Sequence, residues 1–345
     1  MAKVLVIRLS SFGDAAMLVP VVFSVAAKYP RDRFSVMTRK AFAPLFENLG
    51  FNVNVVSLDI NGRHKGIIGL FRVWNRVATQ GFSHVADEHD VLRSKGLRVF
   101  LKLLGRKTAY INKGRDEKQR IIAHKQFNPP IKPTVERYFD VFDKLGFPAQ
   151  MTYNNFFDFI PRDFTKLKSV VTEKKGKWVG IAPFSKHKGK IYPLEKMEKV
   201  VEALSKDDEI TIFLFGAGKE EQKVLTHWKE KYPNIINSSG KFNLTNELLL
   251  ISYLDVMLSM DSANMHLASL VQVPTISIWG ATHPALGFYG FNQDISNAIQ
   301  TDLDCRPCSV YGELPCMRGD YACLEWITEE SVIDRIYGIL NKESV

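Results

Sequence analysis

The stretch 258–267 gathers residue types that could bind a phosphorylated sugar. It places Asp261, Ser262, Ala263 and His266 after an apolar run and at the start of a short helical pattern. Asp261 and Ser262 are of types favoured where a helix begins, so we expect the helix to start there. A helix start has unpaired N–H groups and the positive end of the helix dipole, which attract phosphate.

From this we expect Ser262 and Ala263 to offer backbone N–H groups to a nucleotide diphosphate. His266, one turn further on, could add a donor on the same side. Asp261 would repel phosphate and is better suited to sugar hydroxyls. The alternative is a capped helix that binds no ligand.

Two further loops follow expected strands. The loop 183–193 holds Ser185, Lys186 and Lys190, and such a basic loop at the end of a strand suits an anion. The turn 216–220 ends in Glu220, which could accept hydrogen bonds from a ribose diol. Both loops also have plainer interpretations, a solvated basic loop and the first turn of a helix. The turn is not a G-x-G-x-x-G motif, because Glu221 occupies the last position.

The N-terminus opens with an apolar run at 4–7 and a polar turn that ends at Asp14. This is a strand followed by a helix, and ligands of open α/β sheets bind at the carboxyl ends of strands. Asp14 is therefore a candidate general base, and the alternative is that it only caps the helix.

A basic region covers residues 93–125, with eleven Lys/Arg against two acidic residues, in a chain of net charge +9. Such runs are usually solvated faces, but this excess favours anion binding. We expect a helix over 91–104 and a loop-like segment after it. The core-facing stripe of that helix is predicted to be Leu92, Leu97, Phe100, Leu101 and Leu104. Nucleic acid is one possible anion, but no nucleic-acid motif is recognisable, so a phosphorylated glycolipid is at least as good a candidate.

The whole chain alternates strands and helices, which predicts an α/β fold with parallel sheets. A length of 345 residues favours two domains, and a signal-poor segment at 150–176 is the expected linker. We therefore predict domains at 1–165 and 174–345, with a terminal helix at 328–341 that could pack back on the first domain. No apolar run is long enough to span a membrane and no signal peptide is recognisable, so we expect a cytoplasmic protein.

All four cysteines lie within nineteen residues, at Cys305, Cys308, Cys316 and Cys323. Four thiolates could bind a structural zinc ion, but only the first pair has C-x2-C spacing. Free thiols or redox-formed pairs are the alternative.

Together these loops resemble glycosyltransferase family 9, the ADP-heptose:lipopolysaccharide heptosyltransferases. The resemblance covers most of the chain in the family's order and rests on these segments: Ser10-Ser-Phe-Gly-Asp14 with Pro20, Lys190-Ile-Tyr-Pro193, Gly216-Ala-Gly-Lys-Glu220, Asp261-Ser-Ala-Asn-Met-His266 and Cys305-Arg-Pro-Cys308. It implies a GT-B fold, in which two Rossmann-like domains face each other across a cleft. The acceptor would bind the N-terminal domain and the nucleotide sugar the C-terminal domain.

The resemblance also implies roles for single residues. Asp14 matches the catalytic base and Lys190 the lysine that meets the donor phosphates. The implied donor-binding residues are Ser185, Glu220, Asp261, Ser262, Ala263 and His266. Lys186, which the family motif does not provide, is added to the expected donor site from the basic loop 183–193. The expected acceptor-binding residues combine Ser10 of the first loop with basic residues of the 93–125 region, namely Arg93, Arg115, Lys118 and Arg120.

The expected reaction is an inverting transfer of heptose, or a related sugar, from an ADP-sugar to a lipopolysaccharide or lipooligosaccharide core. The partners would be the nucleotide sugar, an anionic glycolipid and the inner membrane surface at its cytoplasmic face, without nucleic acid. No carboxylate pair accompanies the phosphate loop, so we expect no required metal. One alternative is a transferase or epimerase that uses another nucleotide sugar, such as a UDP-sugar. Another is a non-catalytic nucleotide- or anion-binding protein.

Overall fold

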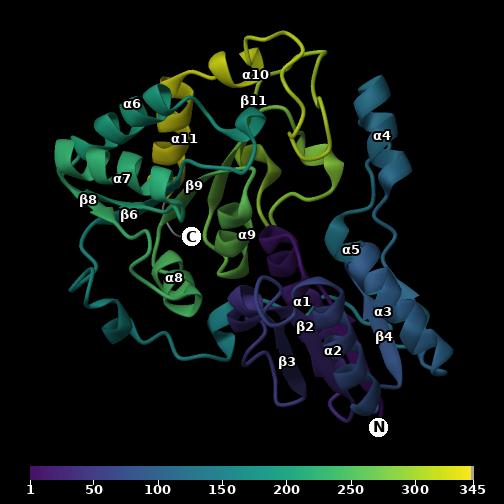
Figure 1. Cartoon of the computed structure of the whole chain (residues 1–345). Coiled ribbons are helices and arrows are strands. Elements are labelled where there is room, and N and C mark those ends of the chain that lie inside the picture. The colour runs from purple at the N-terminus through teal and green to yellow at the C-terminus, as the bar shows by residue number, and fades with distance from the viewer. Residues whose placement is uncertain (343–345) are drawn as a thin grey trace. The chain divides into compact units, whose positions relative to one another are not determined.

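The computed structural model describes residues 1–342, which divide into two compact units (Figure 1). The first unit holds residues 1–113 and 132–161, and the second holds residues 114–131 and the chain from 162 onward. This division differs from the predicted domains at 114–131, because that segment makes its contacts within the second unit. The chain therefore passes from one unit to the other three times.

The sheet of the first unit is parallel, with strand order β3-β2-β1-β4-β5. Its strands are β1 (Lys3–Ile7), β2 (Arg33–Arg39), β3 (Val53–Leu58), β4 (His84–Asp87) and β5 (Lys107–Tyr110). The order reverses direction at β1 and β4, as in Rossmann-like sheets, where ligands bind beside the switch point. Strand β1 was expected from the apolar run at 4–7, whereas β5 lies where a loop-like segment was expected.

Helices cover both faces of this sheet. They are α1 (Phe12–Lys28), α2 (Gly66–Thr79), α3 (Leu92–Leu103) and α5 (Thr134–Leu145), with short 3-10 turns η1 (Lys40–Leu45) and η2 (Phe156–Asp158). Helices α2 and α3 share one core cluster with Leu5 and Ile7 of β1. Helices α1 and α5 pack against each other, and α5 also packs on β4 and β5.

The core-facing stripe predicted for α3 is wrong at its two ends. Leu97 and Leu101 are buried as expected, and Phe100 is half-buried. Leu92 is 89 % exposed and Leu104 is 46 % exposed. The buried stripe continues through Ser94 instead, because positions three and four apart share a helix face, and Leu92 lies off that face.

The sheet of the second unit is also parallel, with strand order β11-β10-β9-β6-β7-β8. Its strands are β6 (Lys177–Ala182), β7 (Ile210–Leu214), β8 (Ile235–Asn237), β9 (Val256–Met260), β10 (Thr275–Trp279) and β11 (Ala298–Gln300). Strands β6 and β9 pair directly, so the loops that follow them start from adjacent points at one edge of the sheet. Those two loops carry most of the expected donor-binding residues.

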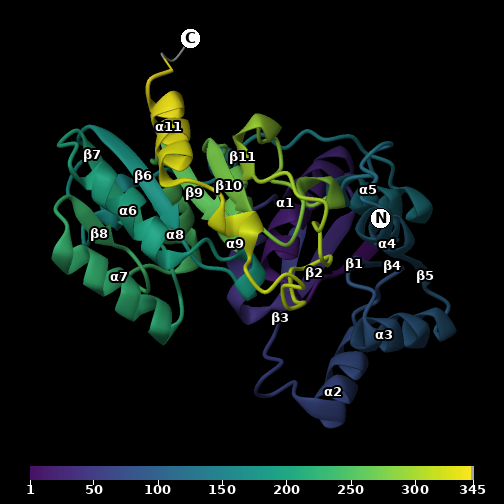
Figure 2. The same cartoon turned by 90° about the horizontal axis from the view of Figure 1, so that it is seen from above.

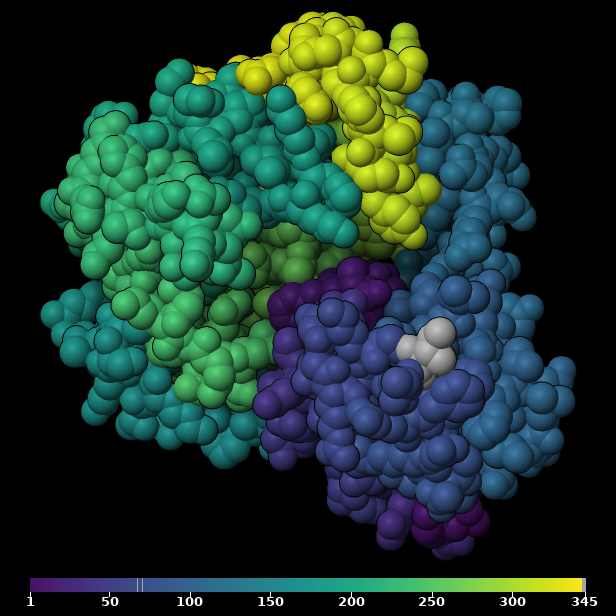
Figure 3. Space-filling model, in the orientation of Figure 1, coloured from purple at the N-terminus to yellow at the C-terminus, as the bar shows by residue number. Residues whose placement is uncertain are grey.

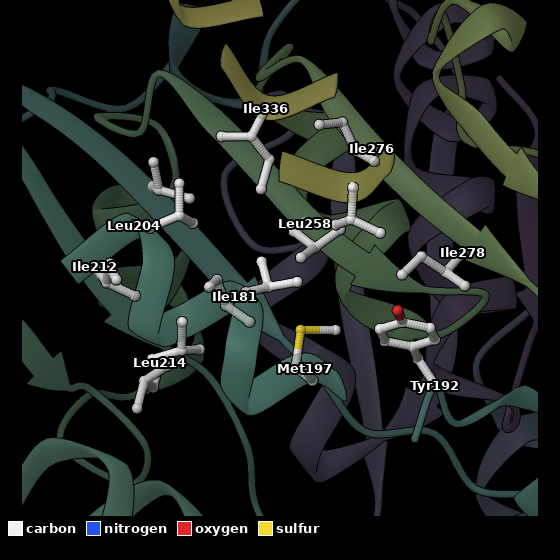
Figure 4. Packing of buried hydrophobic residues seen from close by; sticks show 14 of the residues in the cluster. Ile181, Tyr192, Met197, Leu204, Ile212, Leu214, Leu258, Ile276, Ile278 and Ile336 are labelled. Atoms are coloured by element: carbon white, nitrogen blue, oxygen red, sulfur yellow. The ribbon is translucent and has the colours of Figure 1, made fainter. Parts of the chain in front are cut away.

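The remaining elements of the second unit surround this sheet. They are α4 (Arg115–His124), η3 (Phe164–Leu167), η4 (Lys188–Lys190), α6 (Leu194–Ser205), α7 (Lys219–Lys231), α8 (Leu244–Ile251), α9 (Ala263–Leu270), η5 (Pro284–Leu286), η6 (Ile295–Asn297), α10 (Ala322–Glu325) and α11 (Glu329–Leu340). The main core cluster joins α6 and α11 to the side chains on one face of the strands (Figure 4).

The terminal helix α11, predicted at 328–341, packs into the core of the second unit. Val332, Ile336 and Leu340 lie in the same buried cluster as Leu258 and Met197. The phenol of Tyr192, next to α6, donates to the carbonyl of Ile327 just before α11, at 3.0 Å. Burial of this apolar stripe fixes the position of the helix.

Helix α4 was expected to be part of a loop-like segment, but it is a helix attached to the second unit. Ile121 packs with Ile131 and Leu286 in a small buried cluster. Beyond the helix, Lys125 Nζ donates to the carbonyl of Pro307 at 2.6 Å, and the ring of Phe127 stacks on His283. These contacts explain why 114–131 belongs to the second unit.

Candidate active site

The first candidate loop follows β1 and contains Asp14. Helix α1 begins at Phe12, with Ser11 as N-cap and Asp14 in the first turn. The amide and the hydroxyl of Ser11 both donate to Asp14 Oδ2, at 3.1 Å and 2.7 Å. Asp14 therefore completes a capping box, and its side chain remains 29 % exposed. Both predicted roles, cap and reactive carboxylate, are compatible with this geometry.

Arg8 holds the Asp14 carboxylate through an ion pair of 2.5 Å. Burial disfavours the charged guanidinium, but its interactions with Asp14 first, and then with Tyr138 and Glu88, outweigh this and raise the pKa of Arg8. Arg8 also donates to the backbone carbonyl of Glu88 and lies over the ring of Tyr138. Arg8 thus ties the loop after β1 to the end of β4.

Ser10 contacts a buried histidine at the end of β4. Its hydroxyl lies 2.9 Å from Nε2 of His89. Burial first, and then the positive charge of Arg8, lower the pKa of His89 to about 3. The imidazole is therefore neutral at physiological pH and can accept a hydrogen bond from Ser10.

A polar cluster that follows β4 is organised by Asp87. Asp87 Oδ1 accepts from the amides of His89 and Asp90, and Oδ2 pairs with Arg98 at 2.8 Å. Glu88 is also fully buried, and burial raises the pKa of its carboxyl well above its usual range. Burial therefore favours the neutral form of the Glu88 carboxyl.

The second candidate site lies at the ends of β6 and β9. Lys190 Nζ pairs with Asp261 Oδ2 at 2.8 Å, and their side chains are only 13 % and 3 % exposed. The hydroxyl of Thr282 donates to the same Asp261 oxygen at 2.7 Å. Ser185 Oγ donates to the backbone carbonyl of Asp261 at 3.3 Å. The structure thus brings together three residues that the sequence singled out, Ser185, Lys190 and Asp261.

Helix α9 begins beside this ion pair. Ser262 is its N-cap and Ala263 its first residue, one position later than the earliest expected start. The Ser262 side chain makes no capping hydrogen bond, and its hydroxyl lies 3.1 Å from that of Ser259. His266 is buried one turn into the helix. The backbone N–H groups at this helix start have the orientation and partial charge that suit a phosphate group.

The side chains of Glu220 and Lys186 are both exposed to solvent. Glu220 is at the surface of α7, with its side chain 82 % exposed and paired with Lys223 at 2.8 Å. The neighbouring Glu221 holds the turn instead, by accepting from the amides of Ala217 and Gly218. Lys186 is exposed.

The predicted acceptor-binding residues are divided between the two units. Ser10 and Arg93 belong to the first unit, whereas Arg115, Lys118 and Arg120 lie on α4 in the second. Arg93 lines a pocket of the first unit whose other walls include Ile7, Leu9 and Leu97. Arg115 and Arg120 are exposed, but Lys118 is buried over the ring of Phe288.

All four cysteines are free thiols. Burial raises the pKa of Cys308, and it raises that of Cys323 to about 11. Within residues 1–342, no three His, Cys, Asp or Glu side chains are grouped closely enough to hold a metal ion. The zinc site remains a prediction from the sequence. In the same residues, no helix is long and apolar enough to cross a membrane.

Several site residues were not predicted. Arg8 forms an ion pair with Asp14, and Thr282 donates a hydrogen bond to Asp261. His89 is hydrogen-bonded to Ser10. Arg8 could have been found, because a basic residue directly after a buried strand lies at the same edge as Asp14. Thr282 gives no signal in the sequence, since its role depends on the pairing of β9 with β10.

Two Rossmann-like units, each with polar side chains at the carboxyl edge of its parallel sheet, are the building blocks of the GT-B fold. The family model described as "Glycosyltransferase family 9 (heptosyltransferase)" matches residues 70–314. The chain belongs to this family and is a glycosyltransferase, as the sequence motifs predicted.

Individual relatives agree with this assignment. The lipopolysaccharide core heptosyltransferase OpsX of Haemophilus influenzae is 24 % identical over 89 % of this chain and 84 % of its own length. The lipooligosaccharide heptosyltransferase 2 of Campylobacter jejuni is 22 % identical over 94 % of this chain and 95 % of its own. The solved structure of E. coli heptosyltransferase WaaC with ADP matches 98 % of this chain and 99 % of that chain, with a TM-score of 0.68 and 19 % identity. This last likeness confirms the predicted fold.

Proposed function

We propose that this chain is an inverting heptosyltransferase that moves heptose from ADP-heptose to an anionic glycolipid of the lipopolysaccharide core. Its family membership and the names of its relatives support this substrate class. The enzyme would act in the cytoplasm, at the inner membrane surface where such an acceptor is embedded.

The second unit would bind the donor. As the bond between the sugar and the diphosphate breaks, negative charge develops on the departing ADP. Lys190, the N–H groups of Ser262 and Ala263, and His266 would stabilise that charge, with Lys186 and Ser185 beside them. The ion pair with Asp261 keeps Lys190 at the start of α9, so Asp261 acts as a positioning residue. Glu220, whose carboxylate is exposed, would turn from Lys223 to the ribose diol.

The first unit would bind and activate the acceptor. Asp14 takes the proton from the acceptor hydroxyl, whose oxygen forms a bond to the anomeric carbon as the ADP oxygen leaves. Arg8 and Ser11 hold the carboxylate in one orientation through the contacts that also cap α1. Ser10 and Arg93 would contact the acceptor from this unit. Arg115, Lys118 and Arg120 would supply further positive charge from α4.

No divalent metal is needed in this scheme, because lysine and backbone N–H groups neutralise the diphosphate. Transfer should therefore continue in the presence of EDTA. Elemental analysis of the purified chain tests the separate prediction that the four cysteines hold zinc.

The observation that carries the proposal is the buried Lys190–Asp261 pair beside the start of α9. The test is nucleotide release with different donors, ADP-heptose and UDP-sugars, in the presence and absence of a lipid A–Kdo acceptor. We expect ADP release from ADP-heptose only when acceptor is present. Faster release from a UDP-sugar would overturn the donor assignment. Nucleotide binding without any acceptor-dependent release would indicate a non-catalytic binding protein.

A further inference from the structure

Helices α2 and α3 of the first unit expose large apolar side chains that the proposed chemistry does not use. The exposed fractions are 71 % for Ile68, 56 % for Phe71, 89 % for Leu92, 54 % for Val99 and 82 % for Leu103. Single exposed apolar residues are common on soluble proteins, but several on two adjoining helices indicate an interaction surface.

An aromatic contact chain joins the two helices into one surface. The ring of Phe71 lies 5.7 Å from that of Trp74, which stacks on Phe100 of α3 at 5.1 Å. A Cβ atom at Gly96 would lie 3.0 Å from the Trp74 ring, so glycine permits this close packing. Figure 2 shows α2 beside α3, and Figure 3 shows the face of the first unit that carries α2. We call these exposed residues, with the basic ones named below, the α2–α3 surface.

Apolar and basic residues are interleaved on the outer side of α3. Leu92, Lys95, Val99 and Lys102 recur at intervals of three and four, so they share one face, and all are exposed. Leu97, by contrast, is buried on the opposite face. Aliphatic and basic side chains therefore alternate along the exposed stripe of α3.

The charge of the surface has one sign. Neither 60–86 nor 91–115 contains an Asp or Glu. Asp90, which precedes α3, is already paired with Arg98 at 3.0 Å and with Lys95 at 3.5 Å. The exposed basic side chains of the two helices and their entry are Lys65, Arg72, Arg76, Lys95 and Lys102. Such a surface is complementary to a layer of negative charge.

We propose that the α2–α3 surface docks on an anionic lipid bilayer. Leu92 and Leu103 enter the boundary between headgroups and acyl chains, while Lys102 and Arg76 meet lipid phosphates. Lysine suits this arrangement, because its aliphatic stem can lie along the apolar layer and its ammonium group can reach the phosphates. The inference deepens the proposed function and rests on it, since a lipid-linked acceptor requires the enzyme to work at a bilayer.

The test is co-sedimentation of the full chain with vesicles that contain no saccharide acceptor. We expect binding to phosphatidylglycerol/phosphatidylethanolamine vesicles, weakening with salt, and little binding to phosphatidylcholine. Leu92→Ser/Leu103→Ser should lower the partition coefficient at least tenfold. Lys102→Gln/Arg76→Gln should lower it roughly 25-fold, because each of the two basic residues near an anionic surface contributes about fivefold. The matched controls change exposed residues of the second unit. They are Met317→Ser, at a residue that is 94 % exposed, and Lys168→Gln/Lys229→Gln. Both control variants should bind vesicles like the wild type.

Unchanged vesicle binding by both α2–α3 variants would overturn the inference. So would equal binding of the wild type to phosphatidylcholine. A change in sedimenting mass without lipid in the Leu92→Ser/Leu103→Ser variant would assign the surface to a second copy of this chain instead. Transfer of heptose to a delipidated, water-soluble acceptor separates the two proposals. The α2–α3 variants should transfer heptose to this acceptor like the wild type. If the wild type itself did not transfer heptose to it, the result would count against the proposed function alone.

Discussion

The Lys190–Asp261–Thr282 cluster shows how the side chains of single residues are held ready for a ligand. Lys190 approaches a buried carboxylate that also accepts from Thr282, so its ammonium group has a fixed position before a nucleotide arrives. A lysine positioned in this way loses little conformational entropy when a phosphate binds.

Replacing Lys190 should weaken nucleotide binding. In Lys190→Ala we expect the affinity for ADP to fall by about 1.5–3 kcal/mol, the usual contribution of a hydrogen bond to a charged group. Isothermal titration calorimetry measures the change. Lys188→Ala, at an exposed lysine of the same loop, is the control and should bind ADP normally. Equal affinities of wild type and Lys190→Ala would remove Lys190 from the site.

Asp14 should matter for transfer but not for the donor. Asp14→Asn preserves the shape of the side chain while removing its basicity, and we expect the transfer rate to fall by roughly 10²–10⁴-fold. Affinity for ADP should stay near the wild-type value, because the proposed donor residues belong to the other unit. A variant that transfers heptose at the normal rate would disprove the assignment of the base.

The low pKa of the buried His89 imidazole predicts how the free energy of unfolding depends on pH. Its pKa is about 3 in the folded chain and near 6.5 when unfolded, so between these values the unfolded state binds more protons. The free energy of unfolding should therefore be highest above pH 6.5. It should fall by up to about 1.4 kcal/mol per pH unit as the pH drops towards 3.

Chemical denaturation at several pH values checks this dependence. His89→Gln should flatten the decline, whereas His124→Gln, at an exposed position on α4, should leave it unchanged. Parallel pH profiles for wild type and His89→Gln would show that His89 is not the responsible group.

At the scale of elements, strong periodicity and strand-end loops were predictable from the sequence. The run at 4–7 became a strand because several apolar residues in succession fit a sheet covered on both faces. Strand β5 was missed, since Lys107 and Tyr110 are exposed in it and a short edge strand has no apolar signature. Helix α4 was missed for a similar reason, with only Ile121 and Lys118 buried among its ten residues.

The position of α11 leads to a prediction on stability. Ile336 is fully buried in the core of the second unit, so Ile336→Ala should cost about 2–5 kcal/mol of unfolding free energy. Thermal and denaturant unfolding measure this loss. Asp334→Ala, on the exposed side of the same helix, should cost little. If Ile336→Ala were as stable as Asp334→Ala, α11 would not form part of this core.

At the scale of the whole molecule, length and alternation predicted two α/β units, but not the path of the chain between them. Residues 114–131 belong to the second unit through a few contacts, such as those of Ile121 and Phe127, that become evident only in three dimensions. The loops at Asp14, Lys190 and Asp261 were found because parallel sheets place strand-end loops along one edge. Their partners Arg8 and Thr282 come from pairings between side chains that sequence spacing does not encode.

The most direct test of the account is the anomeric configuration of the transferred heptose, determined by NMR on the product made from ADP-heptose. A single displacement with Asp14 as base and a cation-stabilised ADP leaving group predicts a configuration opposite to that of the donor. A product that keeps the donor's configuration would contradict the proposed mechanism.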